Sequence, residues 1–113
     1  RFMSARGLGD VYKRQELNES NFAPTIEKES AILVEFFATW CPHCQHMQSL
    51  VDQLAHSGKI PVYQVDVDQS PDLANAYAPQ GYPTFVLFVN GKPHGSLVGE
   101  QSLEGLQNFI AAR

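Results

Sequence analysis

Short apolar runs alternate with segments of helical spacing along this chain. The run 31–38 is apolar at nearly every position, which is typical of a strand that is buried on both faces. In the segment 43–56, Met47, Leu50, Val51 and Leu54 fall on one face of a helix. The predicted elements, in chain order, are a helix at 21–29, a strand at 31–38, a helix at 43–56, a strand at 61–67, a helix at 71–77, strands at 84–89 and 92–98, and a helix from 102 onward.

Capping and turn residues separate these elements. Gly58 is placed to end the second helix in a left-handed conformation, and Ser70-Pro71 is a typical helix start. Asn90-Gly91 predicts a tight hairpin between the last two strands, and Ser102 is the expected cap of the last helix. The order αβαβαββα predicts an α/β fold with a central mixed sheet of four to five strands and helices on both faces.

Length and charge restrict the function classes. The chain has 113 residues, 43% of them hydrophobic, which suffices for one domain with its own core. Its net charge of −4 argues against nucleic acid as a partner, and no apolar run reaches the roughly 18 residues of a membrane span. Residues 1–15 show no periodicity and no apolar signal-peptide core, so they are interpreted as a non-native or disordered segment before a domain at 16–113. A cytoplasmic monomer is expected.

The only two cysteines and the only tryptophan lie together in Trp40-Cys41-Pro42-His43-Cys44. At this spacing one helical turn brings both sulfurs within bonding reach. Because the motif lies between a strand and a helix, the partial positive charge of the helix N-terminus stabilises a thiolate at Cys41. A thiolate with a second thiol one turn away indicates thiol–disulfide exchange.

An ordered set of motifs resembles the thioredoxin family over about residues 16–113. The set comprises the Trp-Cys-x-x-Cys motif, Glu35 in the strand before it, Gly81-Tyr82-Pro83-Thr84-Phe85, Asn90-Gly91, and Gly99 before the last helix. The resemblance implies a thioredoxin fold and a redox-active dithiol that needs no bound cofactor. It also implies a first strand near 14–17, which is expected to be short or absent.

Three positions depart from thioredoxin itself. Pro42-His43 stands where thioredoxin has Gly-Pro, and it matches the dipeptide of periplasmic oxidases of the DsbA type. Glu35 replaces an aspartate, as in domains of protein disulfide isomerase, and Gln64 stands where thioredoxin has a lysine near that acid. Only residues 45–82 lie between Cys44 and Pro83, so the helical insertion of the DsbA-type enzymes is absent.

The resemblance implies a catalytic role for three residues. Cys41 is expected to be the nucleophile and the more exposed sulfur, and Cys44 is expected to resolve the mixed disulfide. Glu35 is expected to accept the proton of Cys44, directly or through water. Pro42 and His43 are expected to tune the stability of the Cys41 thiolate.

The family also places a substrate-binding surface beside the sulfurs. A cis peptide is expected between Tyr82 and Pro83, where an extended substrate segment can pair with the backbone. Trp40 is expected either to shield the motif and offer a flat apolar contact, or to pack in the core.

No metal site is predicted from the run Cys-x-His-Cys-x-His. His43 and His46 cannot both converge with the two sulfurs on one ion when all four lie on one helix. Asp66 and Asp68 are expected to be solvated polar positions.

The sequence therefore favours a protein-disulfide reductase of the thioredoxin type. Its expected partners are disulfide-containing protein substrates and an electron donor that resembles thioredoxin reductase or is another dithiol. Two alternatives remain open at this point: an extracytoplasmic disulfide oxidase or isomerase, which Pro42-His43 and Glu35 favour, and a thioredoxin-fold binding or co-chaperone module. No cofactor and no membrane partner are expected.

Overall fold

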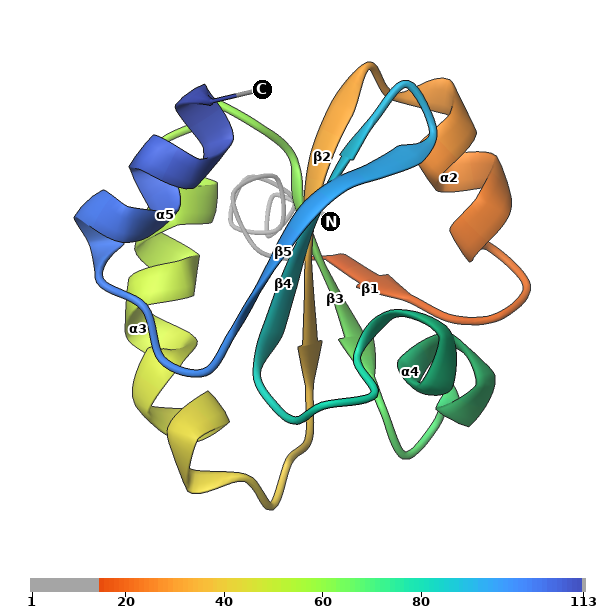
Figure 1. Ribbon diagram of the computed structural model, residues 1–113, viewed down its shortest axis with the longest axis horizontal. Helices are drawn as coiled ribbons and strands as arrows, with labels where there is room; N and C mark the ends of the chain where they lie inside the picture. The colour runs from red at the N-terminus through yellow and green to blue at the C-terminus, as the bar shows by residue number, and fades with distance from the viewer. Residues whose placement is uncertain (1–14, 113) are drawn as a thin grey trace, which may run out of the picture.

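The computed structural model describes residues 15–112, which form a five-stranded mixed sheet with helices on both faces (Figure 1). The elements are β1 (Gln15–Leu17), α2 (Phe22–Lys28), β2 (Ala31–Phe37), α3 (Pro42–His56), β3 (Val62–Asp66), α4 (Pro71–Tyr77), β4 (Thr84–Val89), β5 (Lys92–Val98) and α5 (Leu103–Ala111). The predicted α/β architecture is confirmed, and the first strand is short as expected. β1 begins at Gln15, one residue inside the segment that the sequence marked as doubtful. The rest of that segment, 1–14, lies outside the described residues.

The sheet places β2 at its centre, in the strand order β1-β3-β2-β4-β5. β3 pairs in parallel with both β1 and β2, whereas β4 pairs antiparallel with β2 and β5. The hairpin between β4 and β5 turns at Asn90 and Gly91, whose φ angles of 52° and 81° are the positive values that a tight two-residue turn requires. Because β2 has a neighbour on each side and helices on each face, its carboxyl end is a rigid base for the segment that follows.

Helix starts and ends follow the capping signals. The Ser102 side chain accepts the backbone N–H of Gly105 and so caps α5. Ser70 lies at the N-cap of α4, although its side chain makes no capping hydrogen bond. Gly58 follows the C-cap of α3 with φ of 73°, the left-handed conformation that its sequence position predicted.

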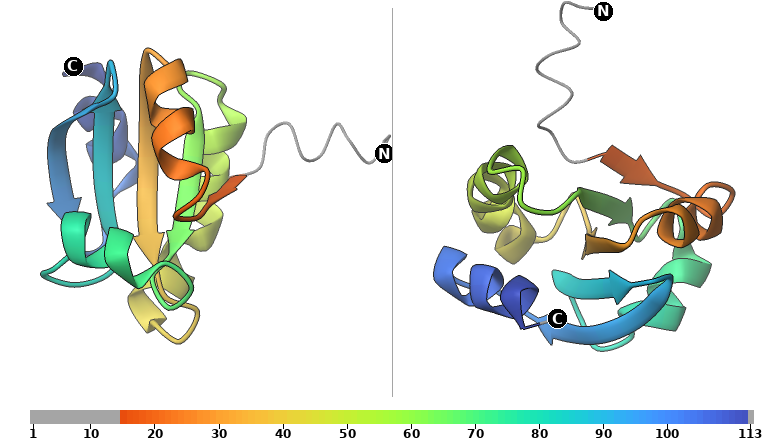
Figure 2. Two further views of the ribbon diagram at one scale, coloured as in Figure 1. Left: turned by 90° about the vertical axis from the view of Figure 1, so that its right-hand side faces the viewer. Right: turned by 90° about the horizontal axis from the view of Figure 1, so that it is seen from above.

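Two cores lie on opposite faces of the sheet (Figures 1 and 2). On the face covered by α3 and α5, Leu33 packs with residues such as Val51 and Leu106. On the face covered by α2 and α4, Val34 packs with residues such as Phe22. Successive strand residues point to opposite faces, so Glu35 lies on the same face as Leu33, beneath α3.

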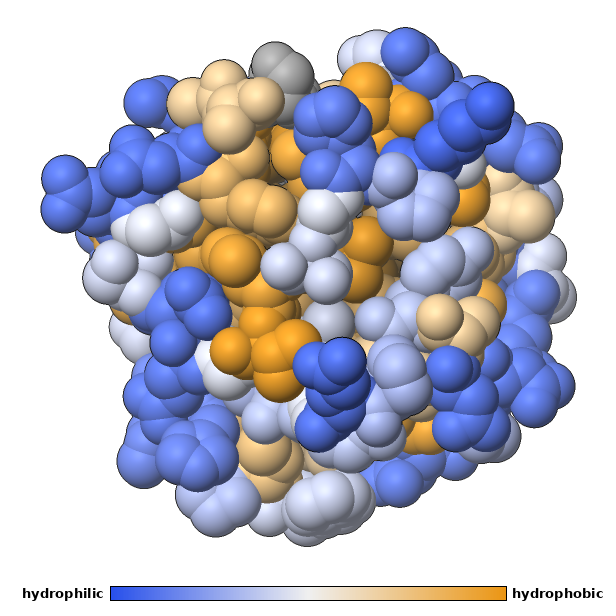
Figure 3. All heavy atoms as spheres, viewed as in Figure 1, coloured by the Kyte–Doolittle hydropathy of each residue, from blue (hydrophilic) through white to orange (hydrophobic). Residues whose placement is uncertain are grey.

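The outer surface of α5 and β5 is the most apolar part of the face seen in Figure 3. Leu97, Leu103 and Phe109 are partly buried there against the core, and Val98 is exposed. Polar side chains surround this area (Figure 3). No helix among residues 15–112 has the length and apolar character that a membrane crossing requires.

Candidate active site

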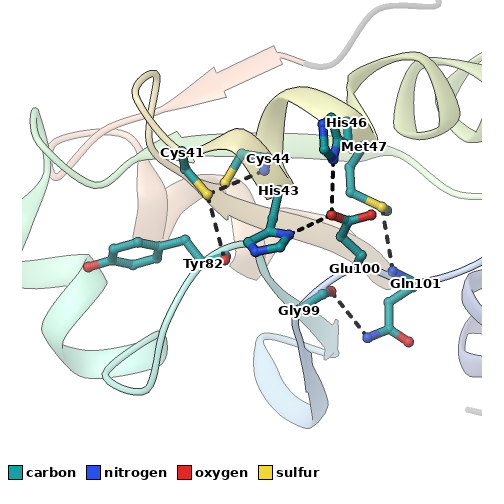
Figure 4. Close-up of polar contacts among 9 residues, drawn as sticks. All are labelled: Cys41, His43, Cys44, His46, Met47, Tyr82, Gly99, Glu100 and Gln101. Atoms are coloured by element: carbon teal, nitrogen blue, oxygen red, sulfur yellow. Dashed lines mark hydrogen bonds and ion pairs between the residues drawn. The ribbon is translucent and has the colours of Figure 1, made fainter.

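The two cysteines lie at the junction between the end of β2 and the start of α3 (Figure 4). Cys41 is the N-cap of α3, with an extended backbone, and its sulfur accepts the backbone N–H of Cys44 at 3.3 Å. The Cys41 thiol also donates to the carbonyl oxygen of Tyr82 at 3.7 Å. Both residues are free thiols. One of the backbone N–H groups that the first turn of α3 leaves without a partner inside the helix is therefore directed at the Cys41 sulfur.

Exposure does not separate the two cysteines as expected. Cys41 is 5% exposed and Cys44 is 4% exposed, so the predicted difference is nearly absent. The reason is that the segment carrying Tyr82 lies against Cys41 and covers it. The expectation that Cys41 is the more exposed of the two cysteines is therefore wrong for the reduced protein.

The surroundings of Cys44 do separate the two thiols. Burial raises the pKa of Cys44 to about 12, and the hydrogen bond with Cys41 adds to this rise. A backbone hydrogen bond with Ala38 acts in the opposite direction, and the negative charges of Cys41 and Glu35 raise the pKa further. Cys44 is consequently a neutral thiol at neutral pH and needs a proton acceptor before it can attack a disulfide.

Glu35 lies directly behind the dithiol. Its side chain is fully buried, on the central strand β2. In the sheet it pairs with Gln64 of β3 on one side and with Phe85 of β4 on the other. Gln64 thus stands beside Glu35, as its place in the family pattern suggested. Glu35 and Cys44 line the same cavity of about 100 Å³, together with Gln48, which is large enough for water.

Trp40 forms the outer rim of the site instead of packing in the core. It is 62% exposed, and its Nε1–H donates to the Asp68 carboxylate at 2.8 Å. Its ring meets the Tyr82 ring edge-to-face, with centroids 6.3 Å apart. The Tyr82 carbonyl therefore lies against the sulfur of Cys41, and the rings of Trp40 and Tyr82 contact each other beside the motif.

Pro83 follows Tyr82 in the chain and anchors this segment to the rest of the fold. The Tyr82–Pro83 peptide is cis, as the resemblance implied. Pro83 is buried, and its carbonyl accepts the N–H of Gly99 at 2.8 Å. Pro83 is therefore not part of the open surface.

Asp66 and Asp68 were both expected to be solvated, and the expectation holds for Asp68 alone. Asp68 is exposed and binds Trp40, as described above. Asp66 is buried, and its carboxylate accepts the backbone N–H of Asp68 at 2.9 Å. The expectation is wrong for Asp66 because this residue closes the turn at the end of β3, where the turn needs an acceptor.

A second polar group, which the sequence did not indicate, lies beside the motif (Figure 4). Nδ1 of His43 lies 2.6 Å from Oε2 of Glu100, and Nδ1 of His46 lies 3.2 Å from the same oxygen. These two contacts, His43 first, hold the pKa of the Glu100 carboxyl below its usual range. Glu100 is remote from the motif in sequence and follows Gly99, which was noted only for its place before the last helix, so no local signal marked it.

The model of the thioredoxin family matches residues 13–112. The chain belongs to the thioredoxin family. A thioredoxin from Alicyclobacillus acidocaldarius is 32% identical over 97 residues, which cover 84% of this chain and 92% of that protein. The chloroplastic thioredoxin M4 of Arabidopsis thaliana is 37% identical over 75% of this chain, but the match spans only 45% of its own length.

Solved thioredoxins share the fold as well as the sequence pattern. A thioredoxin mutant from Halobacterium salinarum superposes with a TM-score of 0.83 at 29% identity, over 90% of this chain and 91% of that chain. The oxidised mitochondrial thioredoxin 3 of Saccharomyces cerevisiae gives 0.81 at 29% identity, over 88% and 95%. The predicted thioredoxin fold is confirmed.

Family membership and the vicinal cysteine pair together make this chain a thioredoxin-type thiol–disulfide oxidoreductase, a protein-disulfide reductase. This confirms the activity that the sequence favoured. The binding-module alternative, in which the cysteines are incidental, does not hold.

Proposed function

We propose that Cys41 attacks the disulfide of a protein substrate and that Cys44 resolves the resulting mixed disulfide. The observation that carries this assignment is the contrast at the helix start. Cys41 receives a backbone N–H from α3, whereas the pKa of Cys44 is raised to about 12. The Cys41 thiolate forms a bond to one substrate sulfur, and the other substrate sulfur leaves as a thiolate that takes a proton from water.

In the second step Cys44 loses its proton and attacks the Cys41 sulfur. The bond between Cys41 and the substrate breaks, the second substrate thiol is released, and Cys41 and Cys44 remain as a disulfide. Two electrons have then passed to the substrate. Glu35 accepts the Cys44 proton through a water in the cavity that the two residues share.

The rim formed by Trp40 and Tyr82 is the proposed substrate surface. The Tyr82 carbonyl lies 3.7 Å from the Cys41 sulfur, so an extended segment that pairs with this backbone brings its own sulfur next to Cys41. Trp40 offers an exposed flat ring at the same place. Pro83 acts as a positioning residue for Tyr82. Pro42 and His43, both exposed, set the electrostatic surroundings of the thiolate.

The partners follow from the electron balance. Each turnover leaves the protein as a disulfide, so a dithiol donor that resembles thioredoxin reductase must return two electrons. This cycle needs a reducing compartment, which agrees with the expected cytoplasmic location. Several plant relatives are named as chloroplastic.

Reduction of insulin disulfides with dithiothreitol as donor tests the assignment. Cys41→Ser should reduce the rate to that of dithiothreitol alone. Cys44→Ser, first reduced, freed of dithiothreitol and then mixed with insulin, should accumulate a covalent adduct with the substrate, visible as an added mass that a thiol removes. His94→Gln, an exposed change on β5, is the control and should behave as wild type. An adduct on Cys44 of the Cys41→Ser variant, with none on Cys41 of the reciprocal variant, would reverse the two roles.

A further inference from the structure

Two histidines and one glutamate converge on a single point outside the dithiol (Figure 4). His43 and His46 direct their Nδ1 atoms at the same oxygen of Glu100, at 2.6 and 3.2 Å. One potential ligand atom from each of the three residues lies within 4.8 Å of the other two. Within residues 15–112 this is the one group of three or more such side chains. A simple ion pair would need only one of the two histidines.

We propose that His43, His46 and Glu100 bind a divalent cation of the zinc class, with at least one coordination position open to solvent. Two imidazoles and a carboxylate are a ligand set that zinc accepts. Ligand atoms about 2.1 Å from a tetrahedral ion lie about 3.4 Å from one another, which falls within the range of the observed separations. This metal site lies next to the dithiol, and the proposal does not depend on the roles proposed for Cys41 and Cys44.

The backbone already holds the three residues in place. His43 and His46 are three positions apart on α3, so they lie on one helix face. Glu100 comes from the loop between β5 and α5, which is fixed on both of its sides: Gly99 donates to the Pro83 carbonyl at 2.8 Å, and the N–H of Gln101 points at the sulfur of Met47 at 3.4 Å. Only side-chain rotations separate this arrangement from a closed ligand set.

Exposure leaves the three side chains accessible to a hydrated ion. The side chains of His43, His46 and Glu100 are 66%, 68% and 41% exposed, so an ion can reach them and keep water on its open side. The absence of a predicted metal site rested on the histidines failing to converge with the sulfurs. In the fold they converge on Glu100 instead, and the two cysteines are not members of the group.

Calorimetric titration with zinc chloride tests the site. The protein carries no affinity tag and is first oxidised to the Cys41–Cys44 disulfide, so that no thiolate can bind the metal. One equivalent of zinc should bind. His46→Gln and Glu100→Gln should each weaken binding by at least about tenfold. His94→Gln and Glu104→Gln, which change the same residue types at exposed positions elsewhere, are the matched controls and should not weaken it.

Histidine ring signals in NMR spectra give a second readout that needs no substitution. Zinc should shift the ring nitrogens of His43 and His46 and leave those of His56 and His94 in place. Thermal unfolding of each variant shows that it is folded. Equal shifts at all four histidines, no saturation at millimolar zinc, or unchanged affinity in both His46→Gln and Glu100→Gln would overturn the proposal.

Discussion

The two sides of the dithiol differ in how far their side chains are exposed to solvent. Behind it, Cys44 and Glu35 are buried and line one cavity of about 100 Å³. In front of it, His43 and Glu100 form an exposed pair, and Trp40 stands open to solvent. The same short motif therefore supplies one buried and one exposed group of neighbours, because residues three apart lie on one helix face and the residues between them do not.

This difference in burial predicts that the two sides of the dithiol control different quantities, the reaction rate on one side and the redox equilibrium on the other. A charge near Cys44 acts in a low dielectric, where its effect on a proton transfer is strong. A charge beside His43 acts through water and is screened by salt. We therefore expect changes behind the dithiol to alter rates strongly, and changes in front of it to shift the equilibrium modestly.

Glu35→Gln should produce the largest effect of the conservative changes. Loss of the proton acceptor should slow the resolution of the mixed disulfide by roughly 100-fold, since positioned general bases contribute about that much or more. Substrate binding should change little, because Glu35 is fully buried and presents no surface to a substrate. Stopped-flow measurement of resolution, beside the KM for the substrate, separates the two quantities.

The same variant should be more stable than wild type. A buried amide carries no charge that folding must strip of water, so the free energy of unfolding at neutral pH should rise by on the order of 1 kcal/mol. Urea unfolding of both proteins measures it. An unchanged resolution rate together with raised stability would leave Glu35 as a structural residue without a role in proton transfer.

Replacement of Pro42-His43 by Gly-Pro should have a smaller effect, on the reduction potential. Thioredoxin lies near about −270 mV and the DsbA-type oxidase near about −120 mV, and this chain should lie between them. The swap should lower the potential by about 30 mV, which is about tenfold in the equilibrium constant. Equilibration with a glutathione series measures it. If the potential stays in place, the exposed dipeptide does not adjust this dithiol.

Glu100→Gln should have the smallest effect. Removal of a charge that is largely in water should change turnover by less than about threefold, and molar salt should erase the difference. Turnover at low and high salt provides the measurement, with Glu104→Gln, a change at another exposed carboxylate, as the control. A large effect that persists in high salt would mean that the front of the site is not screened.

The parts of the site that depend on local pattern could be predicted from the sequence. The apolar run of β2 fixed Glu35 as buried, and the cysteine spacing at a strand–helix junction placed Cys41 at the helix N-cap. The contact between His43 and Glu100 could not be predicted, because it joins residues 57 apart and depends on the path of the β5–α5 loop. The near-equal exposure of the two cysteines was missed for a similar reason, since a distant segment at Tyr82 covers Cys41.

The division between an attacking Cys41 and a resolving Cys44 is tested most directly by limited alkylation of the reduced protein. With the pKa of Cys44 at about 12, this thiol stays neutral and unreactive at pH 7 and gains reactivity only as the pH approaches that value. Brief iodoacetamide treatment at pH 7 followed by mass mapping should therefore find the label on Cys41 and almost none on Cys44. Preferential label on Cys44 would contradict the assignment of both thiols.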